Sequence, residues 1–251
     1  MVYEAMSDIQ DRLQALFPVH YRSGNILLIN ADCMEVMKHI RDGEFELSCV
    51  DPPYGLGETL VAGGTWSVKY QAKGAAWDVA PGREYFEELR RVSANQIIWG
   101  GNYFTEFIKA ARCCISWVKP NMAGMHTMSD FKLALTSFDR NAKVINLSSQ
   151  ANEQRIHVTQ KPVKLYEWLL TNYAKPGQRI LDTHLGSGSS SIAAHDLGFD
   201  FVGMELDADY YAAACKRFEQ HKAQGSLFIP DTPRDAYEQV DFLASAQGFV
   251  A

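Results

Sequence analysis

Residues 179–191 read RILDTHLGSGSSS, and this stretch decides the predicted fold class of the chain. Its first three residues predict a short buried strand, which runs through a glycine turn into a helix that ends at Gly198. The glycines let the backbone approach a ligand closely, and the free N–H groups at the helix start favour an anionic group. This strand, turn and helix therefore predict a nucleoside site at the end of a strand.

The acid after the next strand narrows the choice of ligand. Glu205 comes about twenty residues after the glycine turn, where a carboxylate can accept both hydroxyls of a ribose. Ser191 stands where a dinucleotide fingerprint has its third glycine, which disfavours a cofactor with a pyrophosphate such as NAD. An adenosine cofactor without pyrophosphate fits better, and a tight turn beside a surface acid is the alternative.

Strand-like and helix-like segments alternate along the chain, which is typical of a parallel sheet covered by helices. The clearest helix is expected over Pro162–Tyr173, because apolar residues recur there at spacings of three and four and Pro162 suits a first helical turn. Together these patterns predict an α/β fold. The candidate strands are Asn25–Ile29, Leu47–Val50, Gln96–Trp99, Cys113–Val118, Arg179–Leu181 and Phe201–Met204.

The composition predicts one domain over residues 1–251, since 47% of the residues are hydrophobic and can bury a sizeable core. Two stretches lack a periodic pattern. Residues 55–76 hold five glycines and are expected to form a long mobile loop. Residues 120–158 are expected to be irregular and to form a recognition insert.

The charge is distributed unevenly. The formal net charge is -6, which argues against a cationic coat protein, yet residues 109–164 carry nine lysines and arginines against three acids. This basic stretch predicts contacts with the phosphates of a nucleic acid, and solvated faces of helices are the alternative. Its basic residues are Lys109, Arg112, Lys119, Lys132, Arg140, Lys143, Arg155, Lys161 and Lys164.

Other classes of protein have little support in the sequence. Five cysteines without a CxxC pair predict neither a zinc site nor a disulfide framework, and no metal site is expected. The first residues lack the basic start and apolar run of a secretion signal, and no segment approaches the roughly 20 apolar residues that span a bilayer. We therefore expect a cytoplasmic protein that does not contact a membrane.

A second motif joins a strand end to two prolines. The apolar residues Leu47–Val50 run into Asp51-Pro52-Pro53-Tyr54, where the prolines fix the backbone and leave carbonyls without ladder partners. Asp51 and the carbonyl of Pro52 give two adjacent acceptors for the N–H bonds of an exocyclic amine, and Tyr54 offers a flat face to a base. A rigid proline turn with a half-buried tyrosine is the alternative for the tetrapeptide alone.

These motifs in this order resemble the amino-methylating DNA methyltransferases that use S-adenosylmethionine, in the group whose catalytic tetrapeptide precedes the cofactor motif. The resemblance covers most of residues 25–218. It implies a Rossmann-like sheet with helices on both faces and a small DNA-recognition insert, and it makes Asp51, Pro52, Pro53 and Tyr54 the catalytic residues. The residues implied to bind the cofactor are Asp32, Cys33, Asp51, Lys161, Asp182, His184, Gly186, Ser187, Gly188, Ser189, Glu205 and Leu206.

Two of the matching segments also have simpler explanations. Thr159–Pro162 resembles the family segment that reaches the methionine carboxylate of the cofactor, but Lys161 also fits a solvated lysine at a helix start. Asn30–Cys33 resembles the family turn near the cofactor adenine, but Asp32 with Glu35 three residues later also fits a capping box. The chain departs from the family at His184, where an aromatic ring usually packs on the cofactor.

The resemblance implies methyl transfer from the sulfonium of S-adenosylmethionine to the exocyclic amine of a base flipped out of double-stranded DNA, leaving S-adenosylhomocysteine. Asp51 and the Pro52 carbonyl would orient the lone pair of the nitrogen, and Tyr54 would lie under the base. Asp rather than Ser at the head of the tetrapeptide favours adenine N6, with cytosine N4 as the alternative. The residues expected to contact DNA are Tyr54, Lys119, Lys132, Arg140, Lys143 and Arg155.

Three other functions stay open on the sequence alone: methylation of RNA, methylation of a protein amide, and DNA binding by a cofactor-dependent protein without catalysis. The basic stretch and Asp51 favour DNA over a protein amide, because the family counterpart for amides usually starts with Asn. A homodimer and a cognate restriction enzyme are both compatible with the family. The sequence decides neither of these, nor the role of residues 225–251.

Overall fold

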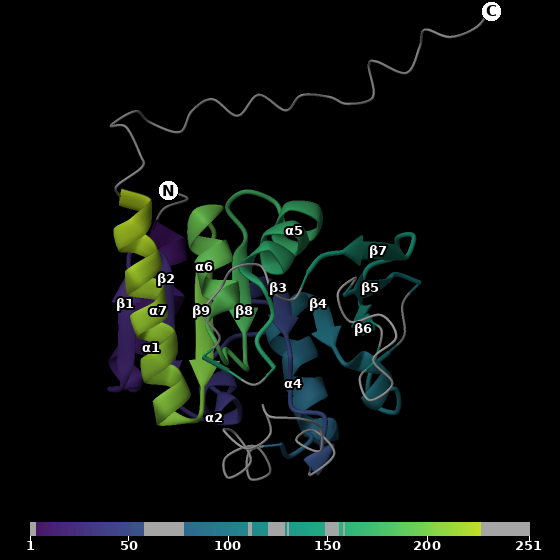
Figure 1. Ribbon diagram of the computed structural model, residues 1–251. Coiled ribbons are helices and arrows are strands. Elements are labelled where there is room, and N and C mark those ends of the chain that lie inside the picture. The colour runs from purple at the N-terminus through teal and green to yellow at the C-terminus, as the bar shows by residue number, and fades with distance from the viewer. Residues whose placement is uncertain are drawn as a thin grey trace, which may run out of the picture.

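The protein is described by a computed structural model over most of the chain. The described residues are 4–57, 78–109, 112–119, 129, 131–148, 156–157 and 159–226. Within them the strands form one sheet in the order β1-β2-β9-β8-β3-β4-β6-β5-β7 (Figure 1). The strands are β1 (His20–Ser23), β2 (Ile26–Asn30), β3 (Phe45–Val50), β4 (Ser93–Trp99), β5 (Cys114–Val118), β6 (Phe131–Thr136), β7 (Lys143–Asn146), β8 (Arg179–Asp182) and β9 (Asp200–Glu205).

The centre of the sheet is parallel. Strands β2, β9, β8, β3 and β4 pair in parallel, so their carboxyl ends meet at one edge. From β8 the chain continues to β9 on one side, and from β3 it continues to β4 on the other side. The order therefore reverses between β8 and β3, which is the place where open α/β sheets bind their ligands.

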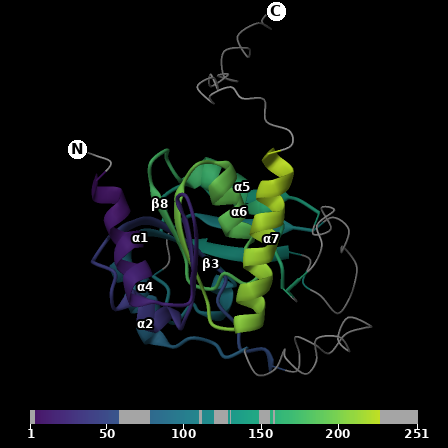
Figure 2. The ribbon, with the colours of Figure 1, turned by 90° about the vertical axis from the view of Figure 1, so that its left-hand side faces the viewer.

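Helices cover both faces of this sheet, as the sequence predicted (Figures 1 and 2). Because side chains alternate along a strand, Ile26 and Leu28 pack with α5, α6 and α7, whereas Leu27 and Ile29 pack with α1, α2 and α4. Two separate cores result. The helices are α1 (Glu4–Leu16), α2 (Cys33–Met37), α4 (Arg83–Val92), α5 (Val163–Tyr173), α6 (Ser189–Asp196) and α7 (Ala208–Ser226).

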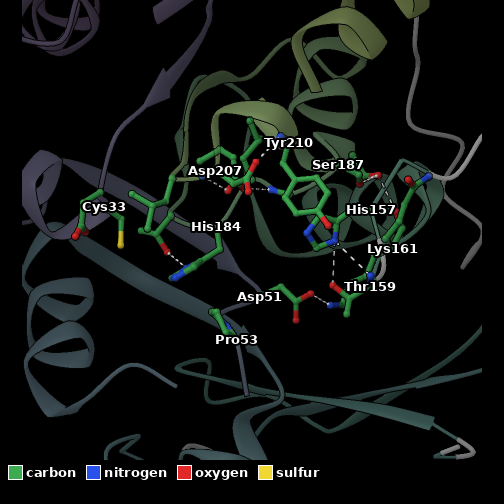
Figure 3. A pocket seen from close by; sticks show the side chains of 18 of the residues that line it. Cys33, Asp51, Pro53, His157, Thr159, Lys161, His184, Ser187, Asp207 and Tyr210 are labelled. Atoms are coloured by element: carbon green, nitrogen blue, oxygen red, sulfur yellow. Dashed lines mark hydrogen bonds and ion pairs between the residues drawn. The ribbon is translucent and has the colours of Figure 1, made fainter. Parts of the chain in front are cut away.

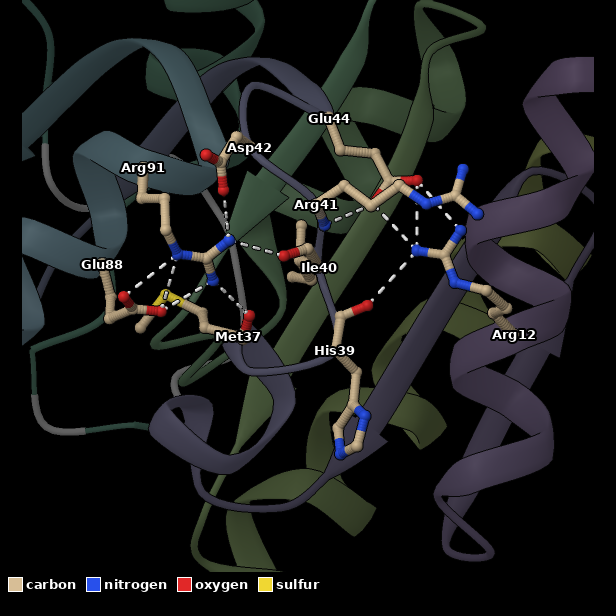
Figure 4. A network of polar contacts seen from close by, with 9 residues as sticks. All are labelled: Arg12, Met37, His39, Ile40, Arg41, Asp42, Glu44, Glu88 and Arg91. Atoms are coloured by element: carbon tan, nitrogen blue, oxygen red, sulfur yellow. Dashed lines mark hydrogen bonds and ion pairs between the residues drawn. The ribbon is translucent and has the colours of Figure 1, made fainter.

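A polar network fixes the helices of one face (Figure 4). Arg12 on α1 donates to the carboxylate of Glu44, with a shortest N–O distance of 2.8 Å. Arg91 on α4 donates to the carbonyl oxygens of Met37 and Ile40, both at 2.7 Å, and so binds the C-terminal end of α2. The segment between α2 and β3 is thereby anchored on both sides, which holds the strand that leads to Asp51.

The six predicted strands are all present, each within three residues of its expected ends. Pro162 lies one residue outside α5, as its N-cap, rather than in the first turn. Gly198 follows the end of α6 with a positive φ of 73°, as expected of a residue that ends a helix. None of the helices in the described part of the chain combines the length and apolar character needed to cross a bilayer.

The prediction that residues 120–158 are irregular was wrong where the structure describes them. This stretch contains β6 and β7, and β6 lies antiparallel between β4 and β5. The sequence signal was weak because β6 has only six residues, of which Ala134 and Thr136 are buried, and its partners lie far away in the chain. Of the loop expected at 55–76, only residues 55–57 fall within the described part.

Candidate active site

A cavity of about 550 Å³ opens at the carboxyl edge of the central strands. Its volume lies in the range of pockets that bind small molecules and cofactors, roughly 300–1,000 Å³. All the predicted cofactor residues line it except Asp182 and Gly188, and Figure 3 shows several of them around the opening. Those that line it are Asp32, Cys33, Asp51, Lys161, His184, Gly186, Ser187, Ser189, Glu205 and Leu206.

The glycine turn and the acid at the end of β9 are joined directly. The N–H of Gly186, whose φ is 54°, donates to one carboxylate oxygen of Glu205 at 2.8 Å. The other oxygen accepts the N–H of Asp207 at 3.0 Å. Burial raises the pKa of Glu205, and the backbone donors oppose this rise. The carboxylate is thus held in place, while each oxygen keeps a lone pair for a ligand hydroxyl.

Asp182 supports the turn from behind the cavity. It is 1% exposed and accepts the hydroxyl of Ser190 at 2.6 Å and the N–H of His184 at 3.0 Å. Burial raises the pKa of Asp182 to about 7. Gly188 is the N-cap of α6 with a φ of 74°. These two predicted residues therefore shape the turn, and its other residues line the cavity.

His184, the departure from the family pattern, is half-buried and packs against Tyr85 of α4. Its Nδ1 atom lies 2.9 Å from the hydroxyl of Thr183, which in turn lies 2.6 Å from the Tyr85 hydroxyl. Burial lowers the pKa of His184 to about 4, although Asp51 and Asp32 act to raise it. The imidazole is therefore neutral at neutral pH. Tyr85 carries no local signal in the sequence, because it comes from a helix outside the motifs.

The sequence also missed the opposite wall of the cavity. His157 packs against Tyr210 of α7, with ring centroids 4.3 Å apart, and its ring lies beside Gly186 (Figure 3). Burial lowers the pKa of His157 to about 4, so this imidazole is also neutral at neutral pH. The two residues come from distant segments, and no local pattern could have paired them.

The carboxylate of Asp51 is engaged on both oxygens. The hydroxyl of Tyr54 donates to one oxygen at 2.7 Å, and Lys161 forms an ion pair with the other (Figure 3). Burial acts to raise the pKa of Asp51, but Lys161 and Tyr54 outweigh it and hold this pKa below its usual range. Asp51 therefore stays ionised at neutral pH.

Lys161 is only 5% exposed, so it is not a solvated lysine. Its ammonium lies 5.4 Å from the centre of the Trp99 ring, and its carbonyl accepts the hydroxyl of Ser189 at 2.7 Å. The structure thus brings Lys161 to Asp51, whereas the family resemblance directs it to the methionine carboxylate of the cofactor. Lys161 also lines the cavity, so a contact with the cofactor is compatible with its position. That contact stays a prediction.

The Tyr54 ring is held on several sides. It stacks on Tyr103 with centroids 4.8 Å apart, and the ammonium of Lys132 lies 5.3 Å from its centre. Gly100 makes this placement feasible, because a Cβ there would lie 2.1 Å from a carbon of the Tyr54 ring. Tyr54 is therefore a fixed aromatic platform beside Asp51.

Asp78 fixes the turn that follows the tetrapeptide. It is 6% exposed, and its carboxylate accepts the backbone N–H groups of Tyr54, Gly55 and Gly57 at 2.8 to 3.1 Å. Three donors on one buried carboxylate hold the residues on either side of 58–77 together. No local pattern indicated this role, since Asp78 lies more than twenty residues after Asp51.

The residues predicted to contact phosphates fall into different environments. Lys119 is 8% exposed, with its ammonium 5.1 Å from the centre of the Trp117 ring. Arg140 is exposed and donates to the carbonyl of Asn172, and Lys143 is exposed at the start of β7. Lys132 is half-buried beside Tyr54. Arg155 lies outside the described residues.

Asp32 does cap a helix, because its side chain accepts the N–H of Met34 at 2.8 Å. Glu35 pairs with Lys38 instead of closing a capping box. Asp32 and Cys33 also line the cavity, so the cap and a ligand contact are compatible.

Comparison with known proteins relates the chain to one family. Residues 138–216 match the N6/N4 family model described as DNA methylase. Type II methyltransferase M2.DpnII of Streptococcus pneumoniae is 21% identical over 247 residues, which cover 80% of this chain and 92% of the relative.

Solved structures share the fold. The M1.HpyAVI complex with SAM aligns with a TM-score of 0.52 and 19% identity, over 76% of this chain and 98% of that one. The cytosine-N4-specific PvuII DNA methyltransferase aligns with a TM-score of 0.56 and 12% identity, over 83% and 95% of the two chains.

Proposed function

The chain is a DNA amino-methyltransferase of the N6/N4 methylase family, and from this premise we propose that it methylates N6 of adenine in double-stranded DNA with S-adenosylmethionine. One observation carries the proposal. The carboxylate of Asp51, which suits an exocyclic amine, lines the same cavity as the glycine turn and Glu205, which suit a nucleoside. Methyl donor and amine acceptor can therefore meet in one site.

The residues present fit the proposed cofactor. Glu205 offers fixed carboxylate oxygens to the ribose hydroxyls, and Gly186 lets the backbone approach the ligand. Asp32 and Cys33 line the cavity where the resemblance expects the adenine. His157 and His184 are neutral at neutral pH, so they add no positive charge beside a cationic sulfonium. When bound, S-adenosylmethionine supplies an electrophilic methyl group.

The chemical task of the chain is to orient a weak nucleophile. The lone pair of an aryl amine is delocalised into the ring, so the amine must be held with that pair directed at the methyl group. The ionised Asp51 and the Pro52 carbonyl accept the two N–H bonds, and Asp51 also stabilises the positive charge that develops on nitrogen. Each oxygen of Asp51 accepts one bond within the protein and keeps a lone pair for this purpose.

A base inside the double helix cannot reach Asp51, so the target is flipped out and stacks on Tyr54. Adenine N6 is proposed over cytosine N4 because the tetrapeptide begins with Asp rather than Ser. The exposed basic residues Arg140 and Lys143 are proposed to contact phosphates. A homodimer and a cognate restriction enzyme stay predictions.

Mass spectrometry of nucleosides tests the proposal directly. Unmethylated duplex DNA of mixed sequence is incubated with the protein and S-adenosylmethionine and then digested. We expect N6-methyladenine, and we expect Asp51→Ala to reduce it by about 1,000-fold or more while cofactor affinity is kept. Detection of N4-methylcytosine would support the same mechanism but would show that the target base is cytosine and not adenine. Near-normal turnover by Asp51→Ala would contradict the proposed role of Asp51 in catalysis.

A further inference from the structure

Lys132 lies over Tyr54, in a cluster with Asp51, Tyr54 and Lys161, although its place in the basic stretch predicted a phosphate contact. The N–H of Gly100 donates to the carbonyl of Leu133 at 2.8 Å, which holds β6 against the turn that accommodates Tyr54. The side chain of Lys132 then extends over Tyr54, with its ammonium 5.3 Å from the ring centre. The ammonium therefore lies over the ring on which the base is proposed to stack, and the flexible side chain must move to the edge of that ring when a base is present.

The charges of the cluster leave the Lys132 ammonium available to a ligand. Asp51 forms its ion pair with Lys161, so Lys132 is not needed to neutralise it. Burial, and then the charge of Lys161, lower the pKa of Lys132. Within the described part of the chain, the ammonium contacts the Tyr54 ring and has no hydrogen-bond partner. A half-buried cation with three donors is best satisfied by an acceptor that arrives with the ligand.

A flipped base brings such an acceptor to this place. When its amine binds Asp51 and its ring stacks on Tyr54, the ring nitrogens next to the amine lie near the same platform. These are N1 and N7 in adenine, or N3 in cytosine. We propose that Lys132 donates a hydrogen bond to a ring nitrogen of the flipped base, which makes it a base-recognition residue. This inference rests on the proposed function and refines it.

The salt dependence of the reaction separates a base contact from a phosphate contact. The kcat/KM on duplex DNA is measured at several salt concentrations for the wild type, K132M and K143A. K132M keeps most of the apolar stem and loses the charge together with the three N–H donors. We expect K132M to lower kcat/KM by about 10- to 100-fold with an unchanged salt slope. Lys143 is exposed on β7, and K143A should reduce the magnitude of the slope by about 0.9 with a smaller loss.

Base analogues then locate the contact. The target adenine is replaced by 1-deazaadenine or 7-deazaadenine, each of which lacks one ring nitrogen; for a cytosine target, 3-deazacytosine is used. The proposal requires that the penalty of K132M shrinks to within about twofold on one of these analogues, as in a double-mutant cycle. The same penalty on every analogue, no penalty at all, or a salt slope reduced as in K143A would each overturn it.

The proposed function and this inference fail in different ways. If the wild type forms no methylated base, the proposed function is contradicted, independently of the result for K132M. If the wild type is active, K132M tests the inference alone, with melting temperature and cofactor affinity as checks of folding. Should K132M not fold, K132Q is measured in the same way.

Discussion

The two sides of the cavity are built differently. Most of the cofactor side comes from one continuous segment, in which β8, the glycine turn, α6 and β9 lead to Glu205 within residues 179–205, and Asp32 and Cys33 are added from the start of α2. The base side draws Asp51, Gly100, Lys132 and Lys161 from four separate segments. Its geometry therefore depends on tertiary packing, and we expect changes there to impair turnover. Changes on the cofactor side should mainly weaken binding of the cofactor.

Replacing Lys161 gives the sharpest test of this division. In Lys161→Met the buried carboxylate of Asp51 loses its ion pair, so its pKa should rise and the acidic limb of the kcat profile should move to higher pH. We expect kcat to fall by about 100-fold or more, because breaking a buried ion pair is strongly unfavourable. Cofactor affinity should change by less than about threefold.

Lys164→Met is the matched control, because Lys164 is exposed in the first turn of α5, three residues after Lys161. Lys164→Met should leave kcat and cofactor affinity near their wild-type values. If Lys161→Met instead weakened cofactor binding and preserved kcat, the lysine would belong to the cofactor side, as the family resemblance implies.

Gly100→Ala should displace the platform without touching any charged group. The added Cβ would overlap the ring of Tyr54, and the φ of 66° disfavours alanine. We expect kcat to fall by about 10- to 100-fold. Gly177→Ala is the control for strain alone, because Gly177 has a φ of 80° but open space around it. If both variants lost the same activity, the loss in Gly100→Ala could be assigned to backbone strain and would not support a role for the position of Tyr54.

On the cofactor side, Glu205→Ala should act mainly on affinity. It removes the acceptor of the Gly186 N–H and the proposed acceptor for the ribose hydroxyls. Isothermal titration with S-adenosylmethionine should show a Kd increased by about 10- to 100-fold, with DNA affinity unchanged. Glu205→Gln keeps one carbonyl oxygen, so its Kd for S-adenosylmethionine should lie between those of the wild type and Glu205→Ala. Weakened DNA binding with normal cofactor binding would place the nucleoside elsewhere.

The smallest expected effect concerns the pH dependence of stability at His184. Its pKa is about 6.5 when unfolded and about 4 when folded, so this histidine lowers stability progressively as the pH falls from 6.5 to 4. Asp182, whose pKa is raised to about 7, acts in the opposite direction over pH 7 to 4. The pKa of His157 is also lowered to about 4, so His157 lowers stability over the same pH range as His184. Asp182 and His157 are both unchanged in His184→Phe, so their contributions cancel when this variant is compared with the wild type.

Urea denaturation at pH 7 and pH 5 measures this contribution. Between the two values, His184→Phe should lose about 2 kcal/mol less stability than the wild type, which is 1.36 kcal/mol for each unit between pH 6.5 and 5. The exposed His39 provides the control variant His39→Phe. The same pH dependence in the wild type and His184→Phe would show that burial does not hold the imidazole neutral.

The sequence by itself determined the elements whose signals are local. The alternation of apolar residues located six strands, and the glycine turn with Glu205 located the cofactor side, because a turn, a helix start and a strand end are fixed by neighbouring residues. The tetrapeptide Asp51–Tyr54 located the amine site for the same reason. The family resemblance also indicated that Lys161 belongs near the cavity, although it directed the lysine to the methionine carboxylate of the cofactor and not to Asp51.

Only the tertiary structure decided how the base side is assembled. The antiparallel insertion of β6 placed Lys132 beside Tyr54, and the packing of the segment before α5 brought Lys161 to Asp51. Asp78 likewise reaches the turn after Tyr54 from beyond residues 58–77. Such contacts leave no local pattern, because each depends on strand order and burial. Burial also holds the two histidines neutral, a property that composition and spacing do not carry.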